Sequence, residues 1–209
     1  MKKFILFDFD GVIVDSHEPA YQSQRTRCPH LTRDDHRKRF EGNVNDHPEH
    51  EDAHTPECQL DLNFFDIYIP KMDTVPVVLG MNEVIAQLAT TYTLIVISST
   101  LTAPIQKLLD RNDLGKYFVE ILGNDVHTSK VEKIKMVFKK YDVGPKDCVF
   151  ITDTLGDLHE AEHMAVGAVA VTWGFHTPET LQKGKSFKLV STPQELIFAV
   201  EEYFAIAEQ

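Results

Sequence analysis

Five short apolar segments, each followed by polar or turn-forming residues, constrain the fold of this chain more than any other feature. Their length favours buried strands, which we expect at 4–8, 93–98, 118–122, 147–152 and 167–172. Segments of helical character lie between and after them, at about 81–91, 102–112, 130–141, 156–165 and 193–206. Because single helices separate these strands, the sequence predicts βαβ units and an α/β fold with a Rossmann-like parallel sheet.

The region 17–78, between the first strand and the second, differs from the rest of the chain. It is strongly polar, contains six of the ten histidines and has no apolar run of the buried-strand kind. Its length far exceeds what a crossover between parallel strands requires. We therefore predict that 17–78 forms a small, mostly helical cap, and that 1–16 together with 79–209 form an α/β catalytic core.

Charge and composition argue against several classes of function. The net charge of -11 implies an acidic surface. Such a surface repels nucleic acid and anionic membranes, so binding to either is disfavoured. No segment approaches the roughly 20 apolar residues that cross a bilayer. The three cysteines, Cys28, Cys58 and Cys148, lack the spacing of a disulfide framework, as is typical of a reducing compartment. We expect a cytoplasmic protein, a monomer or a homodimer, that binds neither nucleic acid nor membranes.

Two acids follow the first apolar segment, in the sequence Asp8-Phe9-Asp10-Gly11. Alternate residues of an extended chain point the same way, so Asp8 and Asp10 are predicted to share a side where the strand ends. Ligands of parallel α/β sheets bind beyond this edge. Neighbouring carboxylates repel each other unless a cation or a proton lies between them, and Mg²⁺ prefers oxygen ligands of this kind. The pattern favours a Mg²⁺ site over its simpler alternative, solvated acids at a strand end.

A second pair of acids, Asp153 and Asp157, follows the fourth apolar segment. Asp157 by itself is explained by its place in the first turn of a helix, where an acid complements the helix dipole. Asp153 ends a strand, and at the tip of an adjacent strand it would face Asp8 and Asp10. We interpret the four acids together as the surroundings of one metal ion.

Ser98, Ser99 and Lys130 complete the set of candidate site residues. A serine after a strand is ordinarily a helix N-cap, and this alternative stays open. Lys130 opens a helix, at the end where the helix dipole disfavours positive charge. A phosphoryl group would need hydroxyl donors and a fixed positive charge to balance four acids. We therefore predict that these three residues bind phosphate.

Four stretches of the chain, in this order, resemble the motifs of the haloacid dehalogenase superfamily: DFDGVIVDS at 8–16, IVISS at 95–99, SKVEK at 129–133 and ITDTLGD at 151–157. The resemblance covers essentially the whole chain outside the insert, and the insert's position matches the helical cap of the superfamily. The chain looks most like phosphoglycolate phosphatase-like and β-phosphoglucomutase-like members.

The resemblance implies a phosphatase that acts on a small phosphorylated metabolite. Asp8 would attack phosphorus to give an aspartyl-phosphate, and Asp10 would act first as general acid and then as general base. Ser98 and Lys130 would hold the equatorial phosphoryl oxygens. The ligands of Mg²⁺ would be the Asp8 carboxylate, the backbone carbonyl of Asp10 and Asp153, with Asp157 close by.

The chain also departs from the superfamily pattern. Thr152 stands where the superfamily usually has glycine, so the approach to the metal loop is expected to be tighter. The cap is short, and the stretch 40–43 resembles a remnant of the loop that selects the substrate. Arg39 and Asn43 are therefore candidate substrate-selecting residues.

Other functions are compatible with parts of the sequence. A phosphomutase would share all core residues, and a non-catalytic relative would bind phosphate or metal without turnover. His159 and His163 belong to an H-E-x-x-H sequence typical of zinc proteases, and side chains at i and i+4 share a helix face. The pattern is short and easily met by chance, so a solvated helix face is the favoured interpretation.

A zinc site in the insert is a further alternative. Its four candidate ligands are spaced by three and four residues, as on one helical face. They are His47, His50, His54 and Cys58. Pro48 and Pro56 argue against a continuous helix there, so a polar cap surface is favoured.

Overall fold

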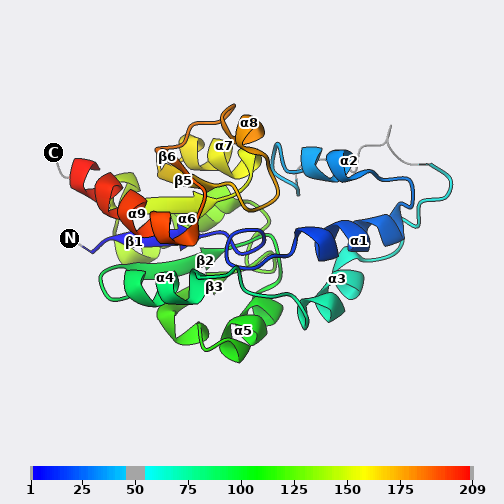
Figure 1. The fold of residues 1–209 in the computed structure, drawn as a ribbon, viewed down its shortest axis with the longest axis horizontal. Helices are drawn as coiled ribbons and strands as arrows, with labels where there is room; N and C mark the ends of the chain where they lie inside the picture. The colour runs from blue at the N-terminus through cyan, green and yellow to red at the C-terminus, as the bar shows by residue number, and fades with distance from the viewer. Residues whose placement is uncertain (1, 46–54, 208–209) are drawn as a thin grey trace.

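Six parallel strands form one sheet in the computed structural model, which describes residues 2–45 and 55–207 (Figure 1). The strands are β1 (Phe4–Phe7), β2 (Thr93–Ile97), β3 (Phe118–Leu122), β4 (Cys148–Thr152), β5 (Gly167–Val171) and β6 (Lys188–Val190). Their order across the sheet is β3-β2-β1-β4-β5-β6. β1 therefore lies between β2 and β4, at the point where the chain changes the side on which it adds strands. The predicted α/β fold with a parallel sheet is confirmed.

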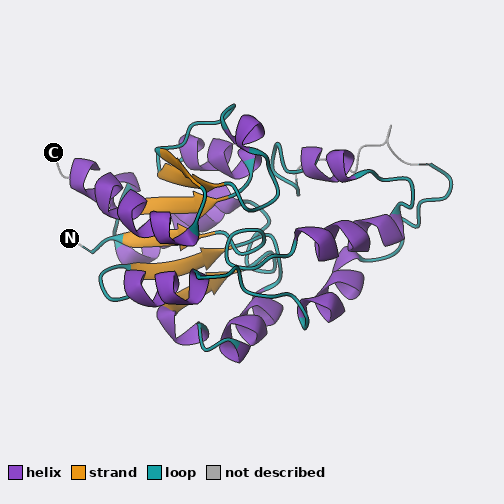
Figure 2. Ribbon diagram, in the orientation of Figure 1, coloured by secondary structure: helices purple, strands orange, loops and turns teal. Residues whose placement is uncertain are grey.

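Helices cover both faces of the sheet (Figure 2). One face packs against α4 (Met81–Leu88), α5 (Thr102–Arg111) and α9 (Pro193–Ala207). The other packs against α6 (Lys130–Tyr141), α7 (Leu155–His163) and α8 (Pro178–Leu181). Two short 3-10 helices, η2 (Gly115–Tyr117) and η3 (Pro145–Asp147), precede β3 and β4.

The core explains why the strands are apolar at every position. In β1, Ile5 and Phe7 belong to one apolar cluster and Phe4 and Leu6 to the other, and all four are fully buried. A strand that is covered on both faces shows no alternation of polar and apolar residues. Polar side chains are thereby confined to the ends of the strands.

Expected and observed elements differ mainly at their ends. β1, β2 and β5 each end one residue earlier than predicted. The helix expected at 156–165 runs from Leu155 to His163, and Ala165 beyond it adopts the left-handed conformation with φ 54°. The sequence does not predict β6 or α8, because elements of three and four residues are too short to give a periodic pattern.

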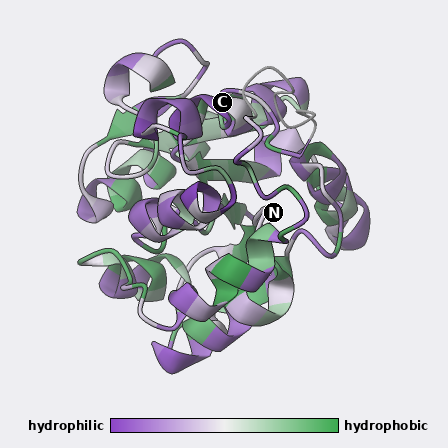
Figure 3. Ribbon diagram, turned by 90° about the vertical axis from the view of Figure 1, so that its right-hand side faces the viewer, coloured by the Kyte–Doolittle hydropathy of each residue, from purple (hydrophilic) through white to green (hydrophobic). Residues whose placement is uncertain are grey.

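Three helices of the 17–78 region lie beyond the carboxyl ends of the strands: α1 (His17–Arg27), α2 (Arg33–Lys38) and α3 (Phe64–Met72) (Figure 1). They form the helical cap that was expected after the first strand. Figure 3, viewed from this side, shows hydrophilic and hydrophobic segments next to one another among the helices. Within the described residues, no helix combines the length and the apolar composition needed to span a bilayer.

Candidate active site

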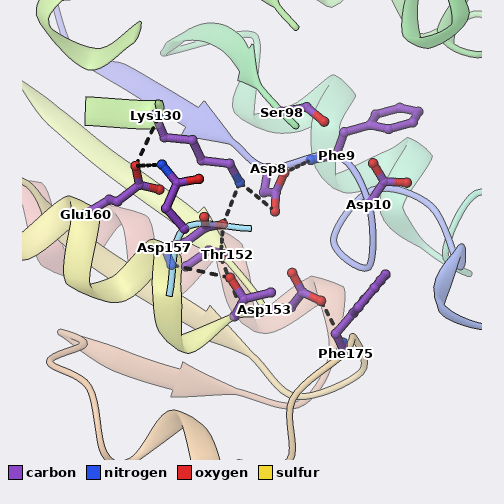
Figure 4. A network of polar contacts seen from close by, with 12 residues as sticks. Asp8, Phe9, Asp10, Ser98, Lys130, Thr152, Asp153, Asp157, Glu160 and Phe175 are labelled. Atoms are coloured by element: carbon purple, nitrogen blue, oxygen red, sulfur yellow. Dashed lines mark hydrogen bonds and ion pairs between the residues drawn. The ribbon is translucent and has the colours of Figure 1, made fainter. Parts of the chain in front are cut away.

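The carboxylate of Asp8 lies in a buried network of charged side chains (Figure 4). Asp8 follows β1, and its N–H donates to the carbonyl of Ile151 in β4 at 2.9 Å. The Nζ atom of Lys130, in the first turn of α6, lies 2.9 Å from Oδ2 of Asp8 and 2.6 Å from Oδ2 of Asp157. None of these three side chains is more than 8% exposed. The fold therefore brings together three predicted site residues that are far apart in the sequence.

Burial and charge act against each other in this network. Burial lowers the pKa of Lys130, but the attraction of Asp157 and Asp8 outweighs it and raises the pKa above its ordinary value. Burial raises the pKa of Asp8 well above its ordinary range, opposed by Lys130 and reinforced by Asp157 and Asp153. For Asp157, burial is outweighed by Lys130, so the pKa of that carboxyl is lowered. One ammonium group thus faces three buried carboxyls, and the network lacks positive charge.

Asp153, directly after β4, is fully buried, and only one of its two carboxylate oxygens has a hydrogen-bond partner in the part of the chain that the structure describes. Its Oδ2 atom accepts the N–H of Phe175 at 2.6 Å, whereas Oδ1 has no hydrogen-bond partner among the described residues. Burial raises the pKa of Asp153 to about 7. The hydrogen bond from Phe175 lowers this pKa, and the repulsion of Asp157 raises it further. The Oδ1 atom is buried, has no hydrogen-bond partner within residues 2–45 and 55–207, and lies near another buried carboxyl. A bound cation would supply the missing interaction. The residues therefore fit a divalent metal.

A metal ion at this point would need ligands other than acidic side chains. Over residues 2–45 and 55–207, no three His, Cys, Asp or Glu side chains gather closely enough to hold a metal ion. Mg²⁺ does not require such a cluster, because it is usually bound by one or two carboxylates and keeps several water molecules.

Gly11 allows the loop after β1 to approach Asp153. Its φ is +74°, in the left-handed region that favours glycine, and a Cβ atom there would overlap the Asp153 carboxylate. A Cβ atom at Gly174, in the loop after β5, would overlap the same carboxylate. Two loops thus enclose Asp153, and neither tolerates a side chain at its point of closest approach.

Asp10 contacts a different set of groups from Asp8. Its Oδ1 atom accepts hydrogen bonds from Ser16 Oγ (2.8 Å) and Tyr68 Oη (2.5 Å), and its Oδ2 atom accepts one from Thr100 Oγ1 (2.7 Å). β1 ends before both acids, so the alternation of an extended strand does not give them shared contacts. Asp10 instead links the loop after β1 to the cap and to the loop after β2.

The hydroxyl-rich segment after β2 has two roles. Ser98 is fully buried: its Oγ atom accepts the N–H of Thr100 at 3.0 Å, and its carbonyl accepts a hydrogen bond from Lys133 Nζ at 2.6 Å. Ser99 and Thr100 line the adjacent cavity. Burial and the nearby Lys130 ammonium lower the pKa of Lys133 to about 8. Ser98 therefore forms hydrogen bonds within the loop that carries Ser99 and Thr100, and its contact with phosphate stays a prediction.

A cavity of about 220 Å³ lies against these groups. Its core side includes Asp8, Asp10, Lys130 and Asp157. Its cap side includes residues of all three cap helices and of the segment after α2. Both predicted substrate-selecting residues, Arg39 and Asn43, line it.

The segment after α2 is docked on the start of α7. The N–H of Gly156 donates to the carbonyl of Phe40 at 2.9 Å, and a Cβ atom at Gly156 would overlap the backbone of Gly42. Asn43 Nδ2 donates to Oε1 of Glu160 at 3.4 Å. The same Glu160 oxygen accepts the backbone N–H of Lys130 at 3.1 Å. The cap is therefore joined directly to the helices that carry the charged network.

The structure bears on both zinc alternatives. His159 and His163 lie exposed on α7, in agreement with a solvated helix face. Of the four candidate ligands in the insert, His47, His50 and His54 lie outside the described residues, and Cys58 contacts His30 Nδ1 with a separation of 3.7 Å.

The family model of haloacid dehalogenase-like hydrolases matches residues 5–171 of the chain, from β1 to the end of β5. The chain belongs to this family. The resemblance seen in its four motifs is thereby confirmed.

Curated relatives of this family member match only in part. The probable phosphatase IndB of Dickeya dadantii is 29% identical over 111 residues, which cover 52% of the chain and 48% of the relative. The phosphoglycolate phosphatase of Synechococcus elongatus is 27% identical over 124 residues, covering 59% and 58%. The chain thus spans about half the length of these relatives.

Solved structures resemble the chain over nearly its whole length. A predicted phosphatase from Clostridium acetobutylicum superposes with a TM-score of 0.77 at 22% identity, covering 97% of this chain and 99% of the other. At this identity, the likeness supports the fold, including the cap, and says nothing of the substrate.

Three site residues escape the sequence analysis. Thr152 is noted only as a departure from glycine, yet its hydroxyl donates to Asp157 Oδ2 at 2.6 Å. Glu160 and Tyr68 reach the site from α7 and α3, and no local pattern distinguishes them from surface or core residues. Only Thr152, which lies within the motif at 151–157, could have been recognised from the sequence.

Proposed function

We propose that this hydrolase is a Mg²⁺-dependent phosphatase that cleaves a small phosphomonoester through a covalent phosphate on Asp8. One observation carries the proposal: the buried Asp8 carboxylate lines the cavity with the Lys130 ammonium 2.9 Å away. An anionic nucleophile beside a fixed cation suits attack on a phosphoryl group. The names of both curated relatives, each a phosphatase, agree with it.

In the first step, an Asp8 oxygen attacks phosphorus while the bond from phosphorus to the leaving alcohol breaks. Asp10 donates a proton to the departing oxygen. Ser16 and Tyr68 donate to one oxygen of the Asp10 carboxyl and Thr100 to the other, which leaves a position on Oδ2 for this proton. Lys130 stabilises the negative charge that spreads over the phosphoryl oxygens.

In the second step, water attacks the phosphorus of the aspartyl-phosphate and Asp10 accepts its proton. The bond between phosphorus and the Asp8 oxygen breaks, which restores the carboxylate and releases inorganic phosphate. The Ser99 hydroxyl, which lines the cavity, would donate to phosphoryl oxygens in both steps, whereas the Thr100 hydroxyl already donates to Asp10.

Asp8, Asp153 and the backbone carbonyl of Asp10 would hold Mg²⁺, with Asp157 close by. When bound, the metal supplies the positive charge that the buried carboxyls lack and offsets the repulsion between nucleophile and substrate. The unpartnered Asp153 oxygen supports this assignment.

We further propose that 17–78 is the cap and that 1–16 and 79–209 form the core. The two connections between these parts run side by side: Val14 and Val77 form an antiparallel bridge, and the N–H of Asp15 donates to the carbonyl of Pro76 at 3.0 Å. Two adjacent crossing points are what an inserted cap requires.

The test measures inorganic phosphate released from 4-nitrophenyl phosphate, with MgCl₂ and with excess EDTA. Hydrolysis should require Mg²⁺ and fall by about 10⁴-fold or more in Asp8→Asn, because the nucleophile is lost. Asp10→Asn should also abolish turnover, since the general acid is lost. Asp142→Asn, at an exposed position after α6, is the matched control and should retain full activity.

Two results would count against the proposal. Turnover that survives EDTA would contradict the requirement for a metal ion. Turnover that survives Asp8→Asn would contradict a covalent phosphate on Asp8. Transfer of phosphate within the substrate, without release of inorganic phosphate, would instead indicate a mutase.

A further inference from the structure

The cap side of the cavity is built largely from aromatic rings. Phe64, Phe65 and Tyr68 line it from α3, and Phe40 and Phe175 line it from the segment after α2 and the loop after β5. The rings of Phe64 and Tyr68 are stacked with centroids 5.2 Å apart, and those of Phe40 and Phe175 meet edge to face at 4.9 Å. Phe64 and Phe65 remain partly exposed, so their rings are available to a ligand.

Two polar side chains on this wall are buried without full hydrogen bonding. Gln24, on α1, is 4% exposed, and its Nε2 amide has no partner among the described residues. His36, on α2, is 2% exposed, and the same holds for its Nδ1 atom. Both line the cavity. Unpaired buried polar atoms are costly and rare, so a group from outside the chain is expected to complete them.

The histidine is neutral in this position. Burial, reinforced by the nearby His17 and arginines, lowers the pKa of His36 to about 3. The two incomplete groups are therefore an amide and a neutral imidazole. The Gln24 amide suits a polar partner with hydrogen-bond acceptors, and Arg39 lines the same cavity.

We propose that this wall binds the alcohol portion of the substrate, and that this portion is a single planar heteroaromatic ring carrying a hydrogen-bond acceptor for Gln24. Planar rings stack on aromatic side chains, as nucleobases do on proteins that bind single strands. A two- or three-carbon chain would leave most of the rings without contact and the Gln24 amide unpaired. The volume of about 220 Å³ limits the ring to a small one. The inference rests on the proposed phosphatase and narrows its substrate class.

The experiment compares kcat/KM for two ring-bearing esters, pyridoxal 5′-phosphate and uridine 5′-monophosphate, with two ring-free esters, 2-phosphoglycolate and glycerol 3-phosphate, at saturating Mg²⁺. At least one ring-bearing ester should exceed both ring-free esters by about tenfold or more. The two ring-bearing probes distinguish a ring attached directly to the phosphoester carbon from one attached through a sugar.

A pair of variants separates recognition from folding. Gln24→Leu keeps the shape of the side chain and should lower kcat/KM for the preferred ring-bearing ester by about tenfold, the effect of one lost hydrogen bond. The same variant should lose less on the ring-free esters, because these leave the Gln24 amide unpaired in the unsubstituted protein as well. Gln22→Leu, on the solvent side of the same helix, should leave all four esters unaffected.

Calorimetry with the dephosphorylated ring alcohols, pyridoxal and uridine, tests the wall without any turnover. Binding without hydrolysis of any ester, 4-nitrophenyl phosphate included, would overturn the proposed phosphatase and leave the ring site standing. Efficient hydrolysis with a ring-free ester preferred, or an equal loss on all esters in Gln24→Leu, would overturn the ring site alone.

Discussion

The two sides of the cavity are built on different principles. On the core side, Asp8, Lys130 and Asp157 are charged, buried and bonded to one another. On the cap side, Gln24 and His36 are neutral, equally buried and incompletely bonded. The core side holds its shape through its own charges and lacks only positive charge, whereas on the cap side Gln24 Nε2 and His36 Nδ1 lack hydrogen-bond partners among the described residues. The comparison indicates that the core supplies the reacting groups and that the cap selects the substrate.

Removing the ammonium of the core side should have the largest effect on the folded state. In Lys130→Met, two carboxylates remain buried without compensation, and we expect the free energy of unfolding to fall by about 3–5 kcal/mol. Phosphatase activity should fall by about 10²–10³-fold. Urea unfolding without metal, at neutral pH, measures the first effect.

The controls for this variant lie in the same network and on the same helix. Because Lys130 and Asp157 are in contact, the double variant Lys130→Met, Asp157→Asn should recover part of the lost stability. Lys135→Met removes an exposed ammonium paired with Glu132 and should cost about 0.5 kcal/mol or less. Equal losses in the two lysine variants would mean that the core network is not charge-compensated as described.

Most residues of the core side could be predicted from the sequence, because short local patterns determine their positions. Acids that directly follow apolar strands must meet at one sheet edge, and this rule alone is enough to place Asp8 and Asp153 together. Asp10 lines the same cavity as Asp8, but its hydrogen bonds come from Ser16, Tyr68 and Thr100, which the strand pattern does not indicate. No local pattern predicts the contact with Tyr68, which lies 58 positions away in the chain.

The cap resisted prediction for the same reason. Its helices were expected as a class, but the cavity wall depends on which rings of three separate segments face inward. The stretch 40–43 was noted, and Asn43 does line the cavity. Gln24 and His36 gave no signal, because a polar residue on a polar helix looks solvated until tertiary packing buries it.

Acid should affect the cap side through His36. The unfolded state takes up a proton near pH 6.5, whereas burial keeps the folded residue neutral down to about pH 3. The stabilising difference is therefore complete above pH 6.5 and is lost as the pH falls toward 3, by up to about 5 kcal/mol. His36→Phe should make the decline of unfolding free energy between pH 6.5 and 4 shallower.

The groups around His36 contribute to the same pH range. They include His17, whose pKa is also lowered, as well as Glu18, Arg37 and Arg39. The measurement is therefore the difference between His36→Phe and the unsubstituted protein, not the absolute slope. His163→Phe, at an exposed position on α7, should leave the slope unchanged. If the pH dependence of the unfolding free energy were unaltered in His36→Phe, the pKa of His36 would not be lowered in the folded state.

Contact between the two sides depends on Gly156. In Gly156→Ala, the added methyl group overlaps the backbone of Gly42, so the segment after α2 must move. We expect a loss of about 1–3 kcal/mol in stability and a rise in KM that exceeds the fall in kcat, since the shift affects the cap wall. Gly144→Ala, where the nearest atom is Asp147 Oδ2 at 4.0 Å, should have no such effect. Equal behaviour of the two alanine variants would show that the cap is not docked on α7.

The smallest effect concerns Thr152, which replaces the usual glycine of the family. Its hydroxyl donates to Asp157 and accepts the N–H of Thr154 at 3.2 Å. Thr152→Val keeps the volume but removes both bonds, and it should cost about 1–2 kcal/mol of stability. Thr152→Ser keeps the hydroxyl and should recover most of that loss. If Thr152→Val were as stable as the unsubstituted protein, Lys130 alone would hold Asp157, and the core side would depend on a single cation rather than on a cation and a hydroxyl.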